Sequence, residues 1–500
     1  MNKTCQTAGS KIITIVTCAG SVHVHERTAI VGGDGGGKSL GEKRMAEITK
    51  IRVNEILDDA PLGRLQILAL VICTLTVVMD GFDTYSVGYV GPFIVKEWAI
   101  SPQFLGVIFS GSMISGILGS IAIAPLADRV GRRRMLVIAN LMFGAASLLG
   151  GWAPDPNTFL VARIITGVGL GAVFPNATAM MADYAPKSYR STFPMWMSAC
   201  MAIGMIIAGS AAAMIIPALG WRSLFYICGI VPIVWAVVIG TALPESIRFL
   251  VLQRPNDPVL RKLLLRLDPS KIPDGPCAFY LDEERSPDSP VREIFKGQRA
   301  RLTITLWFGN SLIYTVTFFI AYWLPSLMMH IGYSIQQTAL VIISLKSGAI
   351  IGTYVLGRMM DRWGESRVLI PSFAIAAICM VVFGLTADNF AMCLVVIFVT
   401  GLFEGGSYSG ILGYAANFYP TAIRSTGLGW VLGGARGVAS IGPLIGGFLF
   451  AGGLSTPAIA ACIAVPLALD AIVVGFLRRM EPRRDMATDE HLISASEVRA

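Results

Sequence analysis

Twelve long apolar stretches constrain this chain more than any other feature of its sequence. A helix needs about 20 consecutive apolar residues to cross a bilayer, and such stretches lie at residues 65–90, 103–127, 134–153, 158–184, 192–216, 222–243, 302–329, 336–357, 367–387, 390–416, 426–450 and 457–477. Only 14% of the 500 residues are charged, whereas soluble domains carry about 25%. These figures exclude a disordered chain, a fibre and an ordinary soluble enzyme. They predict an all-α integral membrane protein with twelve transmembrane helices.

The longest polar interruption separates six of these stretches from the other six. It runs over residues 244–301 and is dense in Arg, Lys, Asp, Glu and Pro, so we expect a linker rather than a core. The expected domains are an N-terminal six-helix half at 45–243, this linker, and a C-terminal six-helix half at 302–478. Residues 1–44 are expected to be a disordered or misassigned extension, and residues 479–500 a tail.

Basic residues are concentrated in every second loop, which bears on orientation. The formal net charge is +8, and on a soluble protein that value would raise nucleic acid as a partner. Here the intervening loops hold little beyond Lys96 and Arg222, and basic loops face the cytoplasm. Both termini are therefore predicted to be cytoplasmic, and nucleic acid is excluded as a partner. The basic loops carry Arg129, Arg132, Arg133, Arg134, Lys187, Arg190, Arg358, Arg362, Arg367 and Arg424.

Cysteine and histidine give no sign of a metal centre. The nine Cys residues form no C-x-x-C pair, and only four His are present. A structural zinc site usually takes four such ligands at short, regular spacing. The sequence therefore predicts no metal site, no disulfide framework and no cofactor.

Two sequence patterns recur in the second half of the chain at nearly the same distance. The segment LADRVGR at Leu126–Arg132 aligns with MMDRWGE at Met359–Glu365, 233 residues later. The segment RST at Arg190–Thr192 aligns with RST at Arg424–Thr426, 234 residues later. A matching offset at two separate places indicates two duplicated six-helix halves. Such halves pack about an axis normal to the membrane and hold the substrate site between them, near the midplane.

These motifs also carry a family resemblance that covers about residues 50–480. The segment APLADRVGRRR at Ala124–Arg134 resembles the loop signature G-x-L-A-D-R-x-G-R-R of the major facilitator superfamily, with Ala124 where Gly is usual. The segment PESIRFL at Pro244–Leu250 resembles a second element of that superfamily. Within the first span, DGFD at Asp80–Asp83 resembles the pattern of the aromatic acid:proton symporter family. The resemblance implies the major facilitator fold and proton-driven import of a small aromatic acid across a bacterial inner membrane.

Acidic residues inside the spans are the candidates for proton coupling. A charge at the centre of a bilayer costs about 2.5–3.5 kcal/mol on insertion scales, so each needs a reason. Asp80 and Asp83 stand at i and i+3 on one helical face, and their mutual repulsion favours holding a proton. Glu404, among glycines in the tenth span, is the third candidate. The alternatives are a structural pair held by a fixed Arg, and for Glu404 a hydrogen bond between helices.

Basic residues inside the spans are the candidates for substrate binding. An Arg side chain can grip a carboxylate with two parallel hydrogen bonds, which favours Arg436 first and then Arg163 as anchors for an anionic substrate. Lys346 is a third candidate, and Tyr322 and Asn310 in the seventh span are expected to line the pocket. The alternative for Arg163 is that its side chain reaches the outer headgroups. The family resemblance supports roles for Asp80, Asp83, Arg163 and Arg436 but not for Lys346.

Charged residues in the repeated loops are the candidates for gating. A carboxylate there can accept hydrogen bonds from a neighbouring helix N-terminus, and the arginines can pair with it. Such pairs would hold the cytoplasmic side closed while the carrier is open to the outside. The alternative is that the arginines only set topology and membrane-surface charge. The predicted gating residues are Asp128, Arg129, Arg132, Asp361, Arg362, Asp183, Arg190 and Arg424.

The N-terminal extension contains a pattern that resembles a nucleotide-binding loop. Residues 32–39 fit G-x-x-x-x-G-K-S, but that motif needs a strand before it and a helix after it, and little chain precedes the first span. An ATP-using membrane enzyme rests on this pattern alone. We expect instead that translation begins at Met45.

The sequence therefore favours a transporter, not an enzyme, that imports an aromatic carboxylate with protons by alternating access. The partners it implies are a small aromatic acid, protons and the lipid bilayer, with no obligate protein partner. The alternative is a major facilitator antiporter that exports drugs or organic anions, because buried charges suit that activity too.

Overall fold

The computed structural model describes residues 11–18, 21–28, 49–59, 62–186, 189, 192–255, 257–273, 277–281, 290–419 and 421–480. The chain divides into two units, Met1–Ile48 and Thr49–Ala500. In the first unit, β1 (Lys11–Cys18) pairs antiparallel with β2 (Ser21–Thr28), within the segment expected to be disordered. Met45 and the pattern at 32–39 lie outside the described residues.

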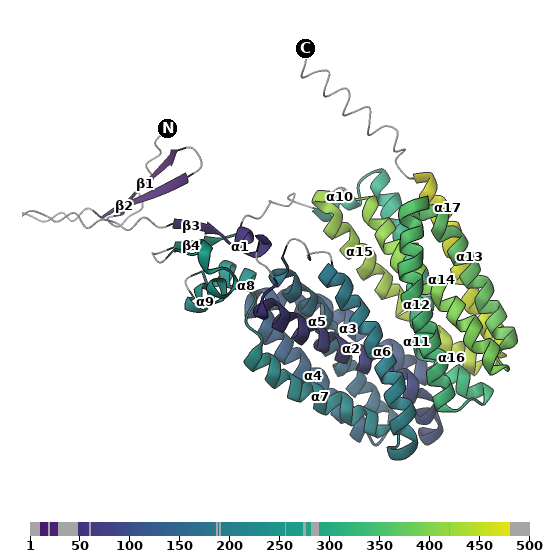
Figure 1. The fold of residues 1–500 in the computed structure, drawn as a ribbon. Helices are drawn as coiled ribbons and strands as arrows, with labels where there is room; N and C mark the ends of the chain where they lie inside the picture. The colour runs from purple at the N-terminus through teal and green to yellow at the C-terminus, as the bar shows by residue number, and fades with distance from the viewer. Residues whose placement is uncertain are drawn as a thin grey trace, which may run out of the picture. The chain divides into compact units, whose positions relative to one another are not determined.

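Twelve spans are present in the described part of the second unit, as the sequence predicted. In Figure 1 the helices of each half group into a bundle. The N-terminal half contains α2 (Arg64–Trp98), α3 (Pro102–Val130), α4 (Arg132–Trp152), α5 (Pro156–Tyr184), α6 (Thr192–Leu219) and α7 (Arg222–Ala242). The C-terminal half contains α11 (Gln298–Ile331), α12 (Ile335–Trp363), α13 (Glu365–Thr386), α14 (Phe390–Asn417), α15 (Thr421–Ala439), α16 (Ile441–Ala451) and α17 (Thr456–Met480). The eleventh span is two helices, α15 and α16, interrupted at Ser440.

The first span extends further than its sequence suggested. Its expected end at residue 90 was placed before Gly91 and Pro92, but α2 continues to Trp98. Proline inside a helix removes one hydrogen bond, yet the following residues remain apolar and Ile94 is fully buried. Gly91 lies against the side chains of Phe109 and Leu105 on α3. Packing in the bundle therefore overrides the local break signal.

The linker is also more ordered than its composition suggested. It contains α8 (Ile247–Gln253), α9 (Pro258–Leu267), the short 3-10 turn η2 (Pro269–Lys271), β4 (Cys277–Tyr280) and α10 (Pro290–Ile294). The segment before the first span, β3 (Thr49–Arg52) and α1 (Val53–Asp59), packs on it: β3 pairs in parallel with β4. Lys271 Nζ donates a hydrogen bond to the Glu55 carbonyl at 2.9 Å. Val53 and Leu264 are fully buried members of one apolar cluster that continues into the N-terminal half.

The ends of the spans define two faces of the bundle. The linker face is the one at which α2 begins and α7 ends, and the opposite face is the one at which α2 ends and α3 begins. The first span begins at Arg64 and the last span ends at Met480. Because there are twelve spans, both of these ends lie at the linker face.

The two halves meet closely towards the opposite face. A Cβ added to Gly106 of α3 would lie 2.9 Å from the Pro443 carbonyl oxygen near the start of α16, and one added to Gly88 of α2 would lie 2.8 Å from the Ala321 carbonyl oxygen of α11. Gln336 Nε2 of α12 donates to the Ala213 carbonyl of α6 at 3.3 Å. Since main chain lies against main chain at these points, the structure is closed at the opposite face.

We predict that Gly106→Val opens that face. The new side chain would collide with backbone, which cannot move aside as a flexible side chain can, so the halves must separate there. Spin labels at the exposed positions Asn157 and Asp388, in a chain stripped of native cysteines, should report a distance several Å longer. Gly475→Val, where nothing lies within 4 Å of an added Cβ, is the control. An unchanged distance in the Gly106 variant would show that this contact does not hold the face closed.

Candidate functional site

Two buried charged residues of the N-terminal half, Asp83 and Arg163, form an ion pair. Asp83 of α2 and Arg163 of α5 are each 1% exposed, with Nη2–Oδ2 at 3.0 Å and Nη1–Oδ1 at 3.3 Å. Ser147 Oγ of α4 donates to Asp83 Oδ1 at 2.8 Å. The guanidinium also lies 5.6 Å from the ring centroid of Phe225. In this conformation Asp83 is thus held by a fixed arginine, and the side chain of Arg163 is buried rather than directed to headgroups.

Asp80, one turn earlier on α2, faces the other half of the protein. It is 2% exposed and accepts a hydrogen bond from Thr84 Oγ1 at 3.3 Å. Its carboxyl interacts electrostatically with Arg436 of α15. The two aspartates of the DGFD segment therefore have different surroundings: Asp83 is paired within its own half, and Asp80 interacts across the halves.

Arg436 is the centre of the second arrangement. Arg436 is partly exposed, unlike Arg163, and it interacts electrostatically with Tyr314 of α11. Its guanidinium lies 5.9 Å from the ring centroid of Phe174 of α5, across the halves. The ring of Tyr408 of α14 lies 4.7 Å from that of Tyr314. A guanidinium with aromatic neighbours and an accessible surface can hold the carboxylate of a ring-bearing acid.

Glu404 belongs to a third group of charges, in the C-terminal half. Thr317 Oγ1 of α11 donates a hydrogen bond to Glu404 Oε1, and Lys346 of α12 interacts with the same carboxyl electrostatically. Glu404 is 3% exposed, whereas Lys346 is partly exposed. Tyr85 of α2 interacts with Asp80, Glu404 and Arg436. The Asp80–Arg436 group and the Glu404–Lys346 group therefore both interact with the same tyrosine.

A row of aromatic side chains on α11 runs beside these charges. The ring centroids of Tyr314 and Phe318 are 6.2 Å apart, and those of Phe318 and Tyr322 are 6.4 Å apart. Tyr322 stacks on Phe109 of α3 at 5.0 Å and interacts electrostatically with Arg163 and Asp83. The row thus connects the Arg436 group to the Asp83–Arg163 pair.

Asn310 sits one turn before this row and is fully buried. Its Nδ2 donates to the Leu306 carbonyl at 2.9 Å, and its Oδ1 has no hydrogen-bond partner in the described part of the chain. The free oxygen leaves Asn310 with acceptor capacity, but no contact ties it to the charged groups.

Sequence reasoning missed several residues that complete the site. They are Tyr85, Ser147, Phe174 and Thr317. A weak signal existed for Thr317, which follows Tyr314 by three positions on α11. The contacts of Ser147 and Phe174 join helices that are far apart in the sequence. The spacing of residues along the chain therefore could not indicate these two residues.

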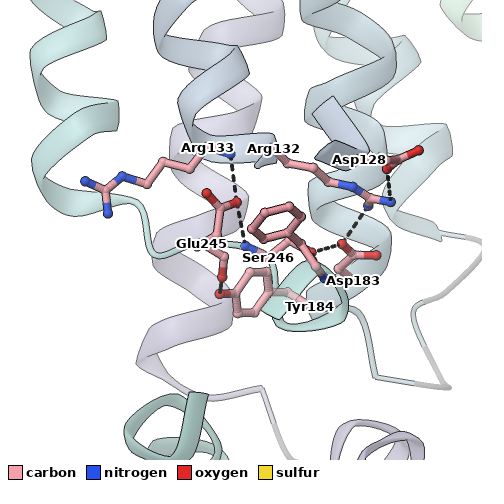
Figure 2. A network of polar contacts seen from close by, with 8 residues as sticks. Asp128, Arg132, Arg133, Asp183, Tyr184, Glu245 and Ser246 are labelled. Carbon is pink, nitrogen blue, oxygen red and sulfur yellow. Dashed lines mark hydrogen bonds and ion pairs between the residues drawn. The ribbon is translucent and has the colours of Figure 1, made fainter. Parts of the chain in front are cut away.

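A second polar network lies at the linker face (Figure 2). Arg132, at the start of α4, holds Asp183 near the end of α5 with Nη1–Oδ2 at 2.6 Å and Asp128 of α3 with Nη2–Oδ1 at 3.5 Å. Ser246 Oγ also donates to Asp183. Glu245 Oε1 accepts from the backbone N–H groups of Arg133 and Ser246, both at 3.0 Å. The network ties the α3–α4 turn to α5 and to the start of the linker.

The remaining predicted gating residues do not join this network. Arg129 is exposed, on the same turn as Asp128. Asp361 and Arg362, which correspond to Asp128 and Arg129 in the C-terminal half, are also exposed. Arg190 lies outside the described residues, and so does the side chain of Arg424. The sequence repeat is therefore not matched by a repeated network among the described side chains.

We predict that Arg132→Gln destabilises the N-terminal half. Asp183 has a side chain that is 4% exposed, and removing the cation from a buried pair costs about 3–5 kcal/mol. Thermal unfolding of the purified protein should therefore move down by several degrees. Arg129→Gln removes the same charge from an exposed position of the same turn and should leave the midpoint within about a degree. Equal midpoints for both variants would mean that the Arg132–Asp183 pair does not stabilise the fold.

Comparison with known proteins agrees with this architecture. The Major Facilitator Superfamily profile matches residues 73–349 and 306–496. The 4-hydroxybenzoate transporter PcaK of Pseudomonas putida is 32% identical over 424 residues, covering 84% of this chain and 94% of that protein. The gallate transporter of Pseudomonas putida is 30% identical, covering 85% and 94%, and the benzoate transport protein of Acinetobacter baylyi is 30% identical, covering 80% and 87%.

Solved structures give the same fold at lower identity. A D-xylose-proton symporter matches with a TM-score of 0.63 at 16% identity, covering 82% of this chain and 97% of that one. The xylose transporter XylE of E. coli, in a partially occluded inward open conformation, matches with a TM-score of 0.64 at 16% identity, covering 85% and 99%. With twelve spans in two halves and relatives that are named transporters, the chain belongs to the major facilitator superfamily and is a transporter rather than an enzyme.

Proposed function

We propose that this protein imports an aromatic carboxylate together with protons. The observation that carries the proposal is the position of Arg436: a partly exposed residue whose guanidinium lies near Phe174 and interacts with Tyr314 and with Asp80 of the other half. Relatives named for 4-hydroxybenzoate, gallate and benzoate make a hydroxybenzoate-like acid the substrate class. No cofactor is needed, since the proton gradient supplies the energy.

Binding and protonation are linked through the same arginine. A charged Asp80 and a substrate carboxylate compete for Arg436, because both are anions in a region of low dielectric. A proton on Asp80 removes that competition. The guanidinium can then bind the substrate carboxylate through two parallel hydrogen bonds. Glu404 with Lys346 is a second place for a proton in the same neighbourhood. Substrate and proton together add no net charge, so the membrane potential does not oppose their entry.

The direction of opening follows from the contact between the halves. Basic loops at the linker face make that face cytoplasmic in a bacterial inner membrane, with both termini on that side. The close contact of α3 with α16 at the opposite face then corresponds to closure to the outside. Rocking of one half against the other, with the Asp83–Arg163 pair as a fixed part of the N-terminal half, would expose Arg436 alternately to each side.

Uptake by cells tests this proposal and separates it from the antiporter alternative. Cells that express the protein should accumulate labelled 4-hydroxybenzoate, and unlabelled benzoate and gallate should compete with it. An empty-vector strain is the control. A carrier that expels organic anions would instead lower the cellular content below that of the control, and no difference from the control for any of these acids would overturn the substrate class.

A further inference from the structure

A basic cavity on the linker face plays no part in the proposed transport cycle. It has a volume of about 430 Å³ and lies where α2 and α4 begin, α7 ends and the linker helices α8 and α9 pack. Its lining includes four arginines: Arg133 and Arg134 from the first turn of α4, Arg254 at the end of α8, and Arg266 in the last turn of α9. Segments far apart in sequence thus contribute positive charge to one hollow.

Most of this charge has no side-chain partner among the residues that the structure describes. Arg133 donates to the Gly240 carbonyl, and in Figure 2 its guanidinium points away from the Arg132–Asp183 network. Arg134, Arg254 and Arg266 are exposed, and their side chains make no hydrogen bond or ion pair within the described residues.

The two acidic residues of the lining balance only part of the charge of the arginines. Glu245 accepts hydrogen bonds from the backbone N–H groups of Arg133 and Ser246. Asp257 accepts from the backbone N–H of Val259 at the start of α9. Both carboxylates are therefore engaged with backbone, and the lining keeps a formal excess of two positive charges, four arginines against two acids.

The cavity also has an apolar side. Leu65 and Leu68 line it from the first two turns of the first span, and Leu68 is 40% exposed. Thr241 and Ala242, at the end of α7, are exposed beside it. Both helices are long and apolar enough to cross a membrane, so we expect the cavity at the depth where headgroups meet acyl chains. A soluble anion would make no use of these apolar residues.

We propose that this cavity binds the phosphodiester headgroup of an anionic phospholipid, with an acyl chain along Leu65 and Leu68. Basic pockets between spans on the cytoplasmic side suit such headgroups, and arginine suits phosphate in particular. The bound phosphate joins the start of α4 to α8 and α9, and so fastens the linker to the N-terminal half.

Lipid binding to the purified full chain tests the proposal. Phosphatidylglycerol added to the protein in neutral detergent should raise the thermal midpoint by several degrees, while phosphatidylcholine should not. The double variant Arg254→Gln/Arg266→Gln should lose most of that rise and bind phosphatidylglycerol at least about tenfold more weakly by native mass spectrometry. The double variant Arg478→Gln/Arg479→Gln, which removes the same charge from the end of α17 on the same face, is the matched control and should keep both.

Three outcomes would overturn the proposal. Equal loss in the two double variants would mean that surface charge in general attracts the lipid. An equal rise with phosphatidylcholine would mean that no anionic headgroup is recognised. A rise of the same size with glycerol 3-phosphate would mean that the cavity takes a soluble phosphate rather than a lipid.

Discussion

Replacing Arg436 by Gln is expected to abolish accumulation of the aromatic acid while leaving the protein folded. The substrate carboxylate loses both hydrogen bonds to the guanidinium. Losing one partner of a desolvated charge pair costs about 2–5 kcal/mol of binding free energy. At about 1.4 kcal/mol for each tenfold change, binding should weaken by a factor between about 30 and several thousand. The Asp80 carboxyl that interacts with Arg436 is 2% exposed, but it can take up a proton, so the loss of Arg436 leaves no charge that must stay buried without a partner. Titration with labelled 4-hydroxybenzoate and uptake in cells measure the effect.

Two further variants sharpen this test. Arg436→Lys keeps the charge but not the two-pronged geometry, so it should bind more weakly than the native protein and more tightly than Arg436→Gln. Tyr314→Phe removes the hydroxyl that interacts electrostatically with Arg436 and keeps the ring, so a smaller loss is expected. Native affinity in Arg436→Gln with an unchanged thermal midpoint would place the carboxylate elsewhere.

Replacing Asp83 by Asn is expected to destabilise the protein severely and to abolish accumulation. The guanidinium of Arg163 would remain 1% exposed without its anion, and leaving a buried charge unpaired costs about 3–5 kcal/mol. The double variant Asp83→Asn/Arg163→Gln removes both charges and should recover much of the lost stability. Thermal unfolding of the single and double variants gives the coupling between the two residues.

The neighbouring aspartate is the matched control for that experiment. Asp80→Asn changes the same chemistry three residues away, but Asp80 has no buried arginine closed upon it, and its partner Arg436 is partly exposed. It should therefore fold normally and lose proton coupling. If Asp80→Asn and Asp83→Asn unfolded at the same temperature, the division of the two aspartates into a structural and a coupling residue would be wrong.

The fold could be predicted from the sequence because lipid imposes one requirement on every span. Apolar length located all twelve helices, and the offset of about 233 residues located the two halves. The errors arose where packing decides against local signals. The first span was predicted to end at residue 90, but the apolar residues after Pro92 stay helical and Ile94 is buried. The polar composition of the linker concealed α9, whose Leu264 packs with Val53.

The candidate site could be predicted only as a set of residues, not as a set of partners. The cost of a buried charge singled out Asp80, Asp83, Arg163, Glu404 and Arg436 from the sequence alone. Which arginine closes on which aspartate depends on how helices separated by many residues face each other. Asp80 and Asp83 share one helical face and influence each other, but Asp83 pairs with Arg163 whereas Asp80 interacts with Arg436. The spacing of the two aspartates could not indicate that they have different basic partners.

Proton movement during uptake is the most direct measurement of the central claim. Purified protein in liposomes that contain a pH-sensitive dye should acidify the interior when 4-hydroxybenzoate is added outside, and an imposed gradient, acid outside, should drive accumulation that a proton ionophore abolishes. Asp80→Asn should bind the acid without either effect. Accumulation that persists with the ionophore, or alkalinisation of the interior as substrate enters, would contradict proton-coupled import.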